Sequence, residues 1–371
     1  MADGGRRETG ASALPWVQVA LPLANLVIAL VIAGVIVRLV GESPWAAFKL
    51  MWNGSVASAD GIGYTLYYAT NFIFTGLAVA VAYHAGVFNI GAEGQAYIGG
   101  LGSGLVALWL GRHSPWLVLP TAIAAGAVFG AAWAFIPAWL QARRGSHVVI
   151  TTIMFNFIAS AVMTYLLVDV LINPGQQSPE TREFPANAWM PAASSLGRWG
   201  TGFAATPLNA SFALALLASI LVWFWLWRTR WGYEWRVVGQ NPDAAVYAGL
   251  KPGNVVVASM LVSGALAGCL GLNELLGSQH RIVLDFPAGA GFVGIAVALM
   301  GRNHPVGIVL AAVLFGALYQ GGSQVSFDMP KVNRDMVIVV QGLVILLCGA
   351  MENVLRSPLD WAARRVRWRT R

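Results

Sequence analysis

The sequence predicts an all-α polytopic membrane protein with about ten transmembrane helices, some of them short or broken. Hydrophobic residues make up 57% of its 371 residues and charged residues only 11%, whereas about 25% of residues are charged in ordinary soluble domains. The mean hydropathy is +0.64. Apolar runs recur along the whole chain, and about 20 apolar residues suffice for a helix to cross a bilayer. The apolar residues are therefore expected to face lipid and other helices.

The first apolar run, 16–37, follows a polar segment, 1–15. Because this run is longer than the core of a signal peptide, which has about 7–15 residues, we interpret it as an uncleaved first span. Segments 291–300 and 305–319 are short and interrupted by Gly or Pro, so they either cross the membrane twice or form partly broken helices. The other predicted spans are 62–83, a third span in the central stretch described below, 116–139, 148–168, 208–227, 255–276 and 336–349.

Two segments between the spans have distinct compositions. Segment 41–60 is amphipathic and is expected to lie at the membrane interface, with Trp45 and Trp52 as aromatic anchors. Segment 173–206 contains several prolines, glycines and serines and charges of both signs. It is the longest predicted extramembrane loop and is too short to form a domain of its own.

The distribution of basic residues indicates the orientation of the chain. Ten spans with an inside N-terminus place most of the 23 Lys and Arg residues in the cytoplasm, as the positive-inside rule requires. Both termini, the basic tail 351–371 and the polar loop 228–253 then lie in the cytoplasm, and loop 173–206 lies outside. The centre of the cytoplasmic loop, 234–250, is predicted to be helical. Because the basic residues stand beside membrane spans, the net charge of +7 does not indicate nucleic-acid binding.

The central stretch, 86–104, interrupts the apolar chain with Asn89, Glu93 and Gln95 among closely spaced glycines. The apolar run behind it, 97–110, would form a helix about 21 Å long, which is shorter than the roughly 30 Å of a bilayer core. Either the Glu93 carboxylate begins a membrane helix, or a glycine-rich polar loop dips into the membrane. The remaining alternative is an interfacial loop with Glu93 in water, near His84.

Residues 289–294 fit the pattern G-x-G-x-x-G of dinucleotide-binding sites. Such a site requires a preceding strand, an amphipathic helix and an acidic residue about 20 positions further on. Here the match opens a short apolar segment and Leu314 stands at that position, so we do not interpret it as a nucleotide site. Glycines at this spacing let membrane helices approach closely, and the glycine pairs in 126–130 and 264–268 predict the same kind of packing.

Other catalytic and metal-binding motifs are absent from the sequence. It contains no Walker A loop, no H-E-x-x-H motif and no G-x-S-x-G nucleophile elbow. The histidines lack metal-ligand spacing, and Cys269 and Cys348 lie in apolar runs as small buried hydrophobes. We therefore predict that the chain is not an enzyme and binds no cofactor or metal of its own.

The segment R-V-V-G-Q-N-P-D-A-A-V-Y-A-G-L, 236–250, predicts a short capped helix. Asn241 is suited to cap its start, Pro242 to occupy its first turn, and Gly249 to end it. One interpretation is a solvated connector between two spans. The other is a short helix that transmits motion from a soluble partner.

Polar residues within the spans are candidates for a solute path, although each is equally suited to a hydrogen bond between helices. The candidate pathway residues, with one adjoining aromatic residue, are Asn71, Asn89, Glu93, Gln95, Phe155, Asn156, Asn273 and Glu274.

Four stretches together resemble a known family: 88–95 (F-N-I-G-A-E-G-Q), 150–159 (I-T-T-I-M-F-N-F-I-A), 238–250 (V-G-Q-N-P-D-A-A-V-Y-A-G-L) and 289–307 (G-A-G-F-V-G-I-A-V-A-L-M-G-R-N-H-P-V-G). They resemble permease subunits of bacterial ABC importers and are most similar to the nucleoside and simple-sugar branch, which is related to the ribose and branched-chain amino-acid permeases. The resemblance runs in order from about Tyr64 to Gly349.

The resemblance implies a transport subunit in the bacterial cytoplasmic membrane that forms half of a translocation pathway, for nucleosides and most of all purine nucleosides. It implies a second, similar permease, an ATPase subunit with two fused nucleotide-binding halves that binds ATP and Mg, and a substrate-binding lipoprotein outside. It also implies that the short cytoplasmic helix couples to the ATPase, through Gly239, Asn241, Pro242, Asp243, Ala244, Tyr247 and Gly249.

Two other functions remain open at this point. One is the same importer class with a simple sugar as its solute. The other is a self-sufficient secondary transporter or channel, for which inverted repeats with broken helices in both halves would be expected.

Overall fold

The computed structural model describes residues 27–28, 31–195, 201–329, 331–332, 336–339 and 342–343. The predicted segments 1–15 and 351–371 lie outside the described residues, as do most of the predicted spans 16–37 and 336–349.

The chain divides into two compact units, which are described separately. Met1–Ala46 and Lys331–Arg371 form one unit, in which the described residues 31–39 and 336–339 are helical. Ala47–Pro330 form the other unit, which contains all the features discussed below.

Six helices among the described residues are long and apolar enough to cross a membrane, and all six coincide with predicted spans. Two further apolar helices are α4 (Ala92–Leu110) and the 11-residue α11 (Ala290–Met300). The count of ten spans stays a prediction. The six long helices are α3 (Ala59–His84), α5 (Pro115–Arg144), α6 with the π-helical turn η1 (Val148–Val170), α7 (Ser211–Arg228), α10 continuing through the π-helix η6 (Pro252–Gln279) and α12 (Pro305–Asp328).

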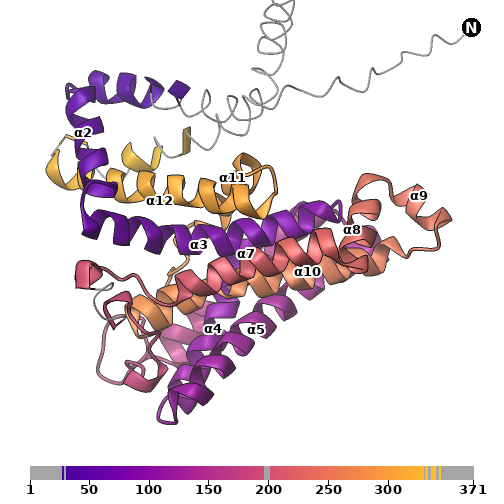
Figure 1. Cartoon of the computed structure of the whole chain (residues 1–371). Helices are drawn as coiled ribbons and strands as arrows, with labels where there is room; N and C mark the ends of the chain where they lie inside the picture. Colours follow the sequence, from indigo (N-terminus) through magenta and orange to yellow (C-terminus); the bar gives the residue numbers. More distant parts are fainter. Residues whose placement is uncertain are drawn as a thin grey trace, which may run out of the picture. The chain divides into compact units, whose positions relative to one another are not determined.

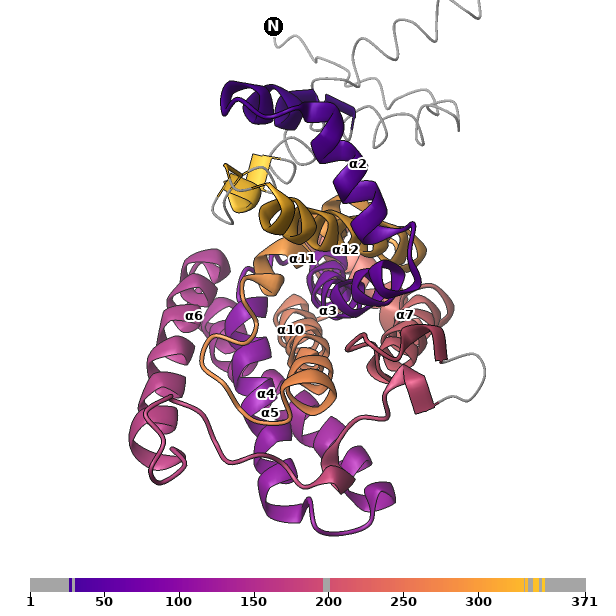
Figure 2. The same cartoon turned by 90° about the vertical axis from the view of Figure 1, so that its left-hand side faces the viewer.

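The helix α3 forms the centre of the larger unit, because most of its length is buried. It packs against α12 on one side and against α7 and α10 on the other (Figure 1). The helix α10 in turn contacts α4 and α5, and α6 packs against α4 at the edge of the bundle (Figure 2).

Glycines allow three of these helices to approach within backbone contact, as the G-x-x-x-G pairs predict. A Cβ atom added at Gly130 of α5 would collide with the backbone of Gly264 of α10, and one added at Gly268 would collide with Gly126. A Cβ at Gly99 of α4 would likewise meet Gly268. The predicted close packing at 126–130 and 264–268 is therefore confirmed.

The predicted end of the ninth span at residue 319 is wrong, because α12 continues to Asp328. The prediction of a short span rested on the glycines and the proline that interrupt segment 305–319. The helix continues there beside α2 (Pro44–Ser55), since a Cβ at Gly321 would lie 2.9 Å from the carbonyl oxygen of Met51. The glycine makes room for a neighbouring helix rather than ending its own.

The predicted helical centre 234–250 is two helices rather than one. These are α8 (Arg230–Gln240) and α9 (Pro242–Tyr247), with Asn241 between them in an extended conformation. A residue that precedes proline is disfavoured in the helical conformation, so the chain turns at Asn241. The side chain of Asn241 then accepts a hydrogen bond of 3.0 Å from the backbone N–H of Ala244 and caps α9, as predicted.

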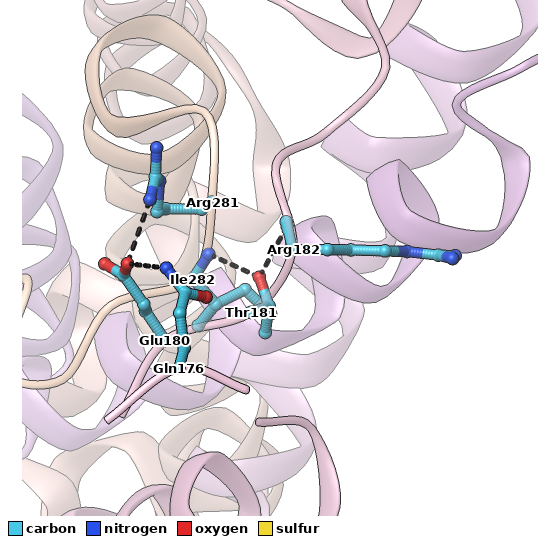
Figure 3. A network of polar contacts seen from close by, with 6 residues as sticks. All are labelled: Gln176, Glu180, Thr181, Arg182, Arg281 and Ile282. Atoms are coloured by element: carbon cyan, nitrogen blue, oxygen red, sulfur yellow. Dashed lines mark hydrogen bonds and ion pairs between the residues drawn. The ribbon is translucent and has the colours of Figure 1, made fainter. Parts of the chain in front are cut away.

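The long loop 173–206 contains no long helix among its described residues. It pairs with the segment after η6 through an isolated bridge between Glu180 and Val283. The backbone N–H of Thr181 donates to the carbonyl oxygen of Ile282, and the backbone N–H of Ile282 donates to the side-chain hydroxyl of Thr181. Arg281 forms an ion pair of 2.9 Å with Glu180 (Figure 3). The loop is thus fastened to the end of the α10 span. Its short 3₁₀ helices are η2 (Ala186–Ala188), η3 (Ala193–Ser195) and η5 (Thr201–Phe203).

Candidate functional site

The central polar stretch forms a break inside the bundle. The chain leaves α3, runs without helical structure through residues 87–90, and begins α4 at Ala92. Glu93 therefore lies in the first turn of a helix, as one of the three alternatives predicts. The irregular segment before it is largely buried in protein, which is where non-helical backbone is tolerated at membrane depth.

The Glu93 carboxylate binds the start of a second broken element. Its Oε1 accepts a hydrogen bond of 2.8 Å from the backbone N–H of Gly289, and its Oε2 one of 2.7 Å from that of Gly291. These N–H groups belong to the N-terminus of α11, the positive end of its helix dipole. The structure gives no support to the alternative of an interfacial Glu93 near His84, because both Glu93 oxygens accept from α11 and the His84 ring contacts the carbonyl oxygen of Asn303 at 3.0 Å.

The G-x-G-x-x-G match at 289–294 has a structural explanation in these contacts. A Cβ at Gly291 would meet the backbone of Glu93, and a Cβ at Gly294 would lie 2.5 Å from the Thr75 hydroxyl oxygen. Gly289 has a φ of +82°, which glycine adopts without strain. The pattern therefore brings α11 against α4 and α3.

Amide side chains hold the irregular segment in place. Asn89 donates hydrogen bonds of 2.8 Å to Gln95 and to Ser263 on α10, and its own oxygen accepts one from the Gly91 N–H at 2.9 Å. Asn156 on α6 accepts from the N–H of Gly94 at 2.9 Å and donates to the carbonyl oxygen of Ile90 at 3.0 Å. Three helices thus meet at this segment.

The neighbouring aromatic candidate, Phe155, is not part of the amide network. Its ring packs against Trp133 of α5 with centroids 5.4 Å apart, and its carbonyl oxygen accepts a hydrogen bond of 3.2 Å from the Trp133 indole.

A second polar network joins α3 to η6 and to the start of α7. Asn71 donates to Glu274 at 2.5 Å, and Asn273 donates to Asn71 at 2.9 Å. Asn209, which precedes α7, donates to Asn273 at 2.9 Å. The structure therefore brings the predicted residues Asn71, Asn273 and Glu274 together, and separately groups Asn89, Glu93 and Gln95.

Four aromatic side chains beside the second network were missed in the sequence. The ring of Tyr68 lies 5.4 Å from that of Tyr67 and 5.8 Å from that of Tyr319, and the ring of Phe72 lies 5.1 Å from Tyr319. Tyr319 is on α12, more than 200 positions from the others, so its place could be found only by knowing that α12 packs on α3.

The short helix α9 projects from the bundle beyond α8 (Figure 1). Tyr247 is 94% exposed, and Asp243 and Ala244 are exposed as well. Ala245 alone is buried, and Gly249 ends the segment with a φ of +81°. The exposed face of α9 is a surface that could bind another protein.

The base of this segment packs tightly against the end of α3. A Cβ at Gly239 would collide with the carbonyl oxygen of His84 and would lie 2.8 Å from the N–H nitrogen of Gly86. The His84 ring lies 5.2 Å from that of Trp227 on α7, and Trp227 lies 4.9 Å from His304. The end of α8 is therefore in direct contact with the residues that lead into the central break.

These features define a multi-pass helical membrane protein with broken elements joined inside its bundle and a short exposed helix at one end. The family model described as "Branched-chain amino acid transport system / permease component" matches residues 61–349. The chain belongs to this family, whose members are transport components rather than enzymes.

Three relatives have similar lengths and identities. The guanosine ABC transporter permease protein NupP of Bacillus subtilis (strain 168) is 34% identical over 334 residues, covering 89% of this chain and 92% of that protein. The glucose ABC transporter permease protein TsgB13 of Haloferax volcanii is 34% identical, with 89% and 87% covered. The nucleoside ABC transporter permease protein NupB of Lactococcus lactis subsp. cremoris is 34% identical, with 88% and 90% covered. No solved structure matches the chain.

Proposed function

We propose that this chain is the membrane subunit of an ATP-driven importer and forms half of a pathway for nucleosides, with purine nucleosides as its main solutes. The exposed, capped helix α9 carries this proposal, because a permease without a nucleotide site of its own needs a surface on which an ATPase acts. Its relatives include proteins named as guanosine and nucleoside permeases. The chain itself then binds no cofactor, and ATP and Mg act on the partner ATPase.

The proposed topology has ten spans and both termini in the cytoplasm of a bacterium, with the protein in the cytoplasmic membrane. Helix α9 then faces the cytoplasm and loop 173–206 the outside. The second permease completes the pathway, an ATPase with two fused nucleotide-binding halves binds α9, and a substrate-binding lipoprotein meets the outer loops.

The proposed mechanism is alternating access driven from α9. ATP-dependent closure of the partner would push α9 and α8, and Gly239 would transmit the movement to Gly86 at the start of the central break. A ligand shifts such an equilibrium only through its different affinity for the two states. The solute path is proposed to pass the two polar networks, with Glu93 and Glu274 as the charged groups that border it.

The test is uptake of labelled guanosine, uridine, glucose and ribose by a strain that lacks the gene, complemented with wild type or with Asp243→Lys plus Tyr247→Ala. A matched control is Arg143→Glu plus Trp139→Ala, which also reverses an exposed charge and removes an exposed aromatic ring, at the end of α5 that the proposed topology places in the cytoplasm, outside α9 and the outer loops. We expect nucleoside uptake with wild type and control only. Co-purification of the ATPase should be lost in the α9 variant alone.

Two results would contradict parts of the proposal. Full uptake by the α9 variant would refute ATPase coupling through α9 and favour a self-powered carrier. Uptake of glucose or ribose in place of nucleosides would keep the importer and replace its solute. That second candidate is supported by the 34% identity to the glucose permease of Haloferax volcanii.

A further inference from the structure

Two of the membrane spans end with an arginine that lies over a tryptophan. The guanidinium of Arg228, the last residue of α7, is 5.4 Å from the ring centroid of Trp223. The guanidinium of Arg144, the last residue of α5, is 5.9 Å from the ring centroid of Trp139. Tryptophan is enriched where the hydrocarbon core meets the headgroups, and arginine extends its charge from there toward water. The two pairs therefore mark one membrane surface, which the proposed topology assigns to the cytoplasm.

The helix α8 begins at this surface, directly after α7. Thr229 separates the two helices, and its hydroxyl donates to the carbonyl oxygen of Trp225 at 2.6 Å and accepts from the N–H of Gly232 at 3.1 Å. A Cβ atom added at Gly232 would collide with the backbone of Trp225, so α8 folds back against the last turn of α7. The start of α8 is therefore held at the level of the membrane interface.

The start of α8 exposes aromatic and basic side chains together. Trp231 is 58% and Tyr233 60% exposed, and the side chain of Arg230 is 89% exposed. Trp231 packs against Trp225 with ring centroids 4.9 Å apart, which fixes its position beside α7. The residues of α8 that are buried in the bundle are Gly232, Trp235 and Val238. Such a helix, with aromatic and basic residues outside and an apolar side turned inward, is typical of a membrane interface.

The charge of this surface is positive. Segment 228–253 carries four basic residues and two acidic ones. Arg228 is exposed, and Arg230 forms an ion pair of 3.1 Å with Glu234. An exposed ion pair of this kind contributes little, so Arg230 can exchange its partner for another anion. Basic residues beside a membrane span attract anionic lipids, and a phosphate accepts strong hydrogen bonds from arginine. The charge therefore favours anionic over zwitterionic headgroups.

We propose that Arg228 and Arg230, with Trp231 as their interfacial anchor, form a contact site for the headgroups of anionic phospholipids, and that transport depends on this contact. The opposite end of α8 packs through Gly239 against Gly86, and α9 follows directly. Lipid bound at the start of α8 fixes that end, so a movement of α9 is passed to the bundle and not lost as sliding of α8 along the membrane. The inference rests on the proposed function for the orientation of α8 and for coupling through α9.

The test is photolabelling of the purified permease–ATPase complex in nanodiscs. Phosphatidylglycerol or phosphatidylcholine, each with a photoreactive group in the acyl chain next to the headgroup, is added at the same mole fraction, and labelled peptides are identified by mass spectrometry. We expect peptides from 228–240 to be labelled more by phosphatidylglycerol. One basic residue near an anionic surface changes association about fivefold. Arg228→Gln plus Arg230→Gln should therefore lower this preference by about fivefold to twentyfold, because Glu234 offsets part of the Arg230 charge.

Two further variants separate this site from general charge effects. Glu234→Gln should raise the preference for phosphatidylglycerol, because it releases Arg230 from its ion pair. The matched control is Arg143→Gln plus Arg144→Gln, which removes the same charge at the end of α5 and should leave the labelling of α8 unchanged. Substrate-stimulated ATP hydrolysis should increase with the fraction of phosphatidylglycerol in wild type and in this control, and much less in the Arg228→Gln plus Arg230→Gln variant.

Equal labelling of α8 by the two lipids in wild type would overturn the inference. So would an absence of label on α8, which would show that the ATPase or the second permease covers this surface, or an unchanged preference in the Arg228→Gln plus Arg230→Gln variant. Labelling requires no transport. A wild-type complex that prefers phosphatidylglycerol at α8 but imports no nucleoside would therefore contradict the proposed function alone.

Discussion

The hydrogen bonds from α11 to Glu93 lead to the sharpest prediction from this structure. The perturbation is Glu93→Gln, which keeps the size of the side chain and removes its charge. An amide has one oxygen, so it can accept from only one of the two backbone N–H groups, and its NH₂ group faces the other donor. Hydrogen bonds to a charged group contribute about 1.5–3 kcal/mol each. The variant should therefore hold the start of α11 less firmly by about that amount.

The assay is hydrogen–deuterium exchange of peptides that contain the Gly289 and Gly291 amides, in the purified complex. Since about 1.4 kcal/mol corresponds to a factor of ten in an equilibrium constant, local opening should raise the exchange rate by about tenfold to a hundredfold. Glu93→Ala should raise it further, because both acceptors are lost. Asp60→Asn is the control, because Asp60 also lies in the first turn of a helix but is exposed.

Two observations would refute this reasoning. Exchange at the start of α11 that is unchanged in both Glu93 variants would show that the carboxylate does not hold this element. Increased exchange throughout the bundle, with the Asp60→Asn control unchanged, would show that Glu93 supports the whole fold rather than one junction.

Three further predictions concern the ends of the bundle. Gly239→Ala should impair uptake and lower the stimulation of the ATPase by substrate, because the added Cβ would collide with His84. The control is Gly253→Ala, which should change neither, because its Cβ would lie 3.4 Å or more from its neighbours. Asn241→Ala should destabilise α9 by about 0.5–2 kcal/mol because the helix loses its cap, whereas Asn241→Asp should not. The two variants are compared by the amount of ATPase that stays bound to each in a pull-down. Burial lowers the pKa of His280, which stacks on Trp189 at 4.0 Å. The folded loop therefore binds fewer protons than the unfolded one, and its stability should fall as the pH drops below about 6.5. The change is measured by the quenching of Trp189 fluorescence, with Trp189→Phe as the control in which this signal is absent. A loop that is more stable at pH 5.5 than at pH 7.5 would contradict the prediction.

The helices could be predicted from the sequence because the length of an apolar run and its flanking residues are local properties. The six long helices coincide with predicted spans, and Asn241 followed by Pro242 correctly marked the start of α9. The end of α12 was misplaced because glycines resemble an interruption of a helix when their neighbours are unknown. The role of Gly321 depends on α2, which packs against it.

The candidate site was only partly predictable, because its residues are joined over long sequence separations. The polarity of Glu93 in an apolar stretch indicated a special position, but nothing local identifies its partners Gly289 and Gly291, which are 196 and 198 positions away. Tyr319 was missed for the same reason. A single tyrosine near the end of an apolar helix is unremarkable until α3 brings Tyr68 beside it.

The contacts from α9 to α11 form a short path, and a double-mutant cycle tests whether they act together. Gly239 packs on Gly86, segment 87–91 leads from there to α4, and Glu93 holds α11. Proximity alone does not demonstrate coupling, whereas non-additive effects of distant substitutions do. We expect Gly239→Ala and Glu93→Gln together to reduce ATP-driven uptake little more than the stronger single variant, because either one interrupts the same path. Gly253→Ala combined with Glu93→Gln should leave the effect of Glu93→Gln unchanged. Losses that multiply in the first pair would show that α9 and α11 act independently, and the movement of α9 would then have to reach the pathway through α10, which also contacts α8 and α9.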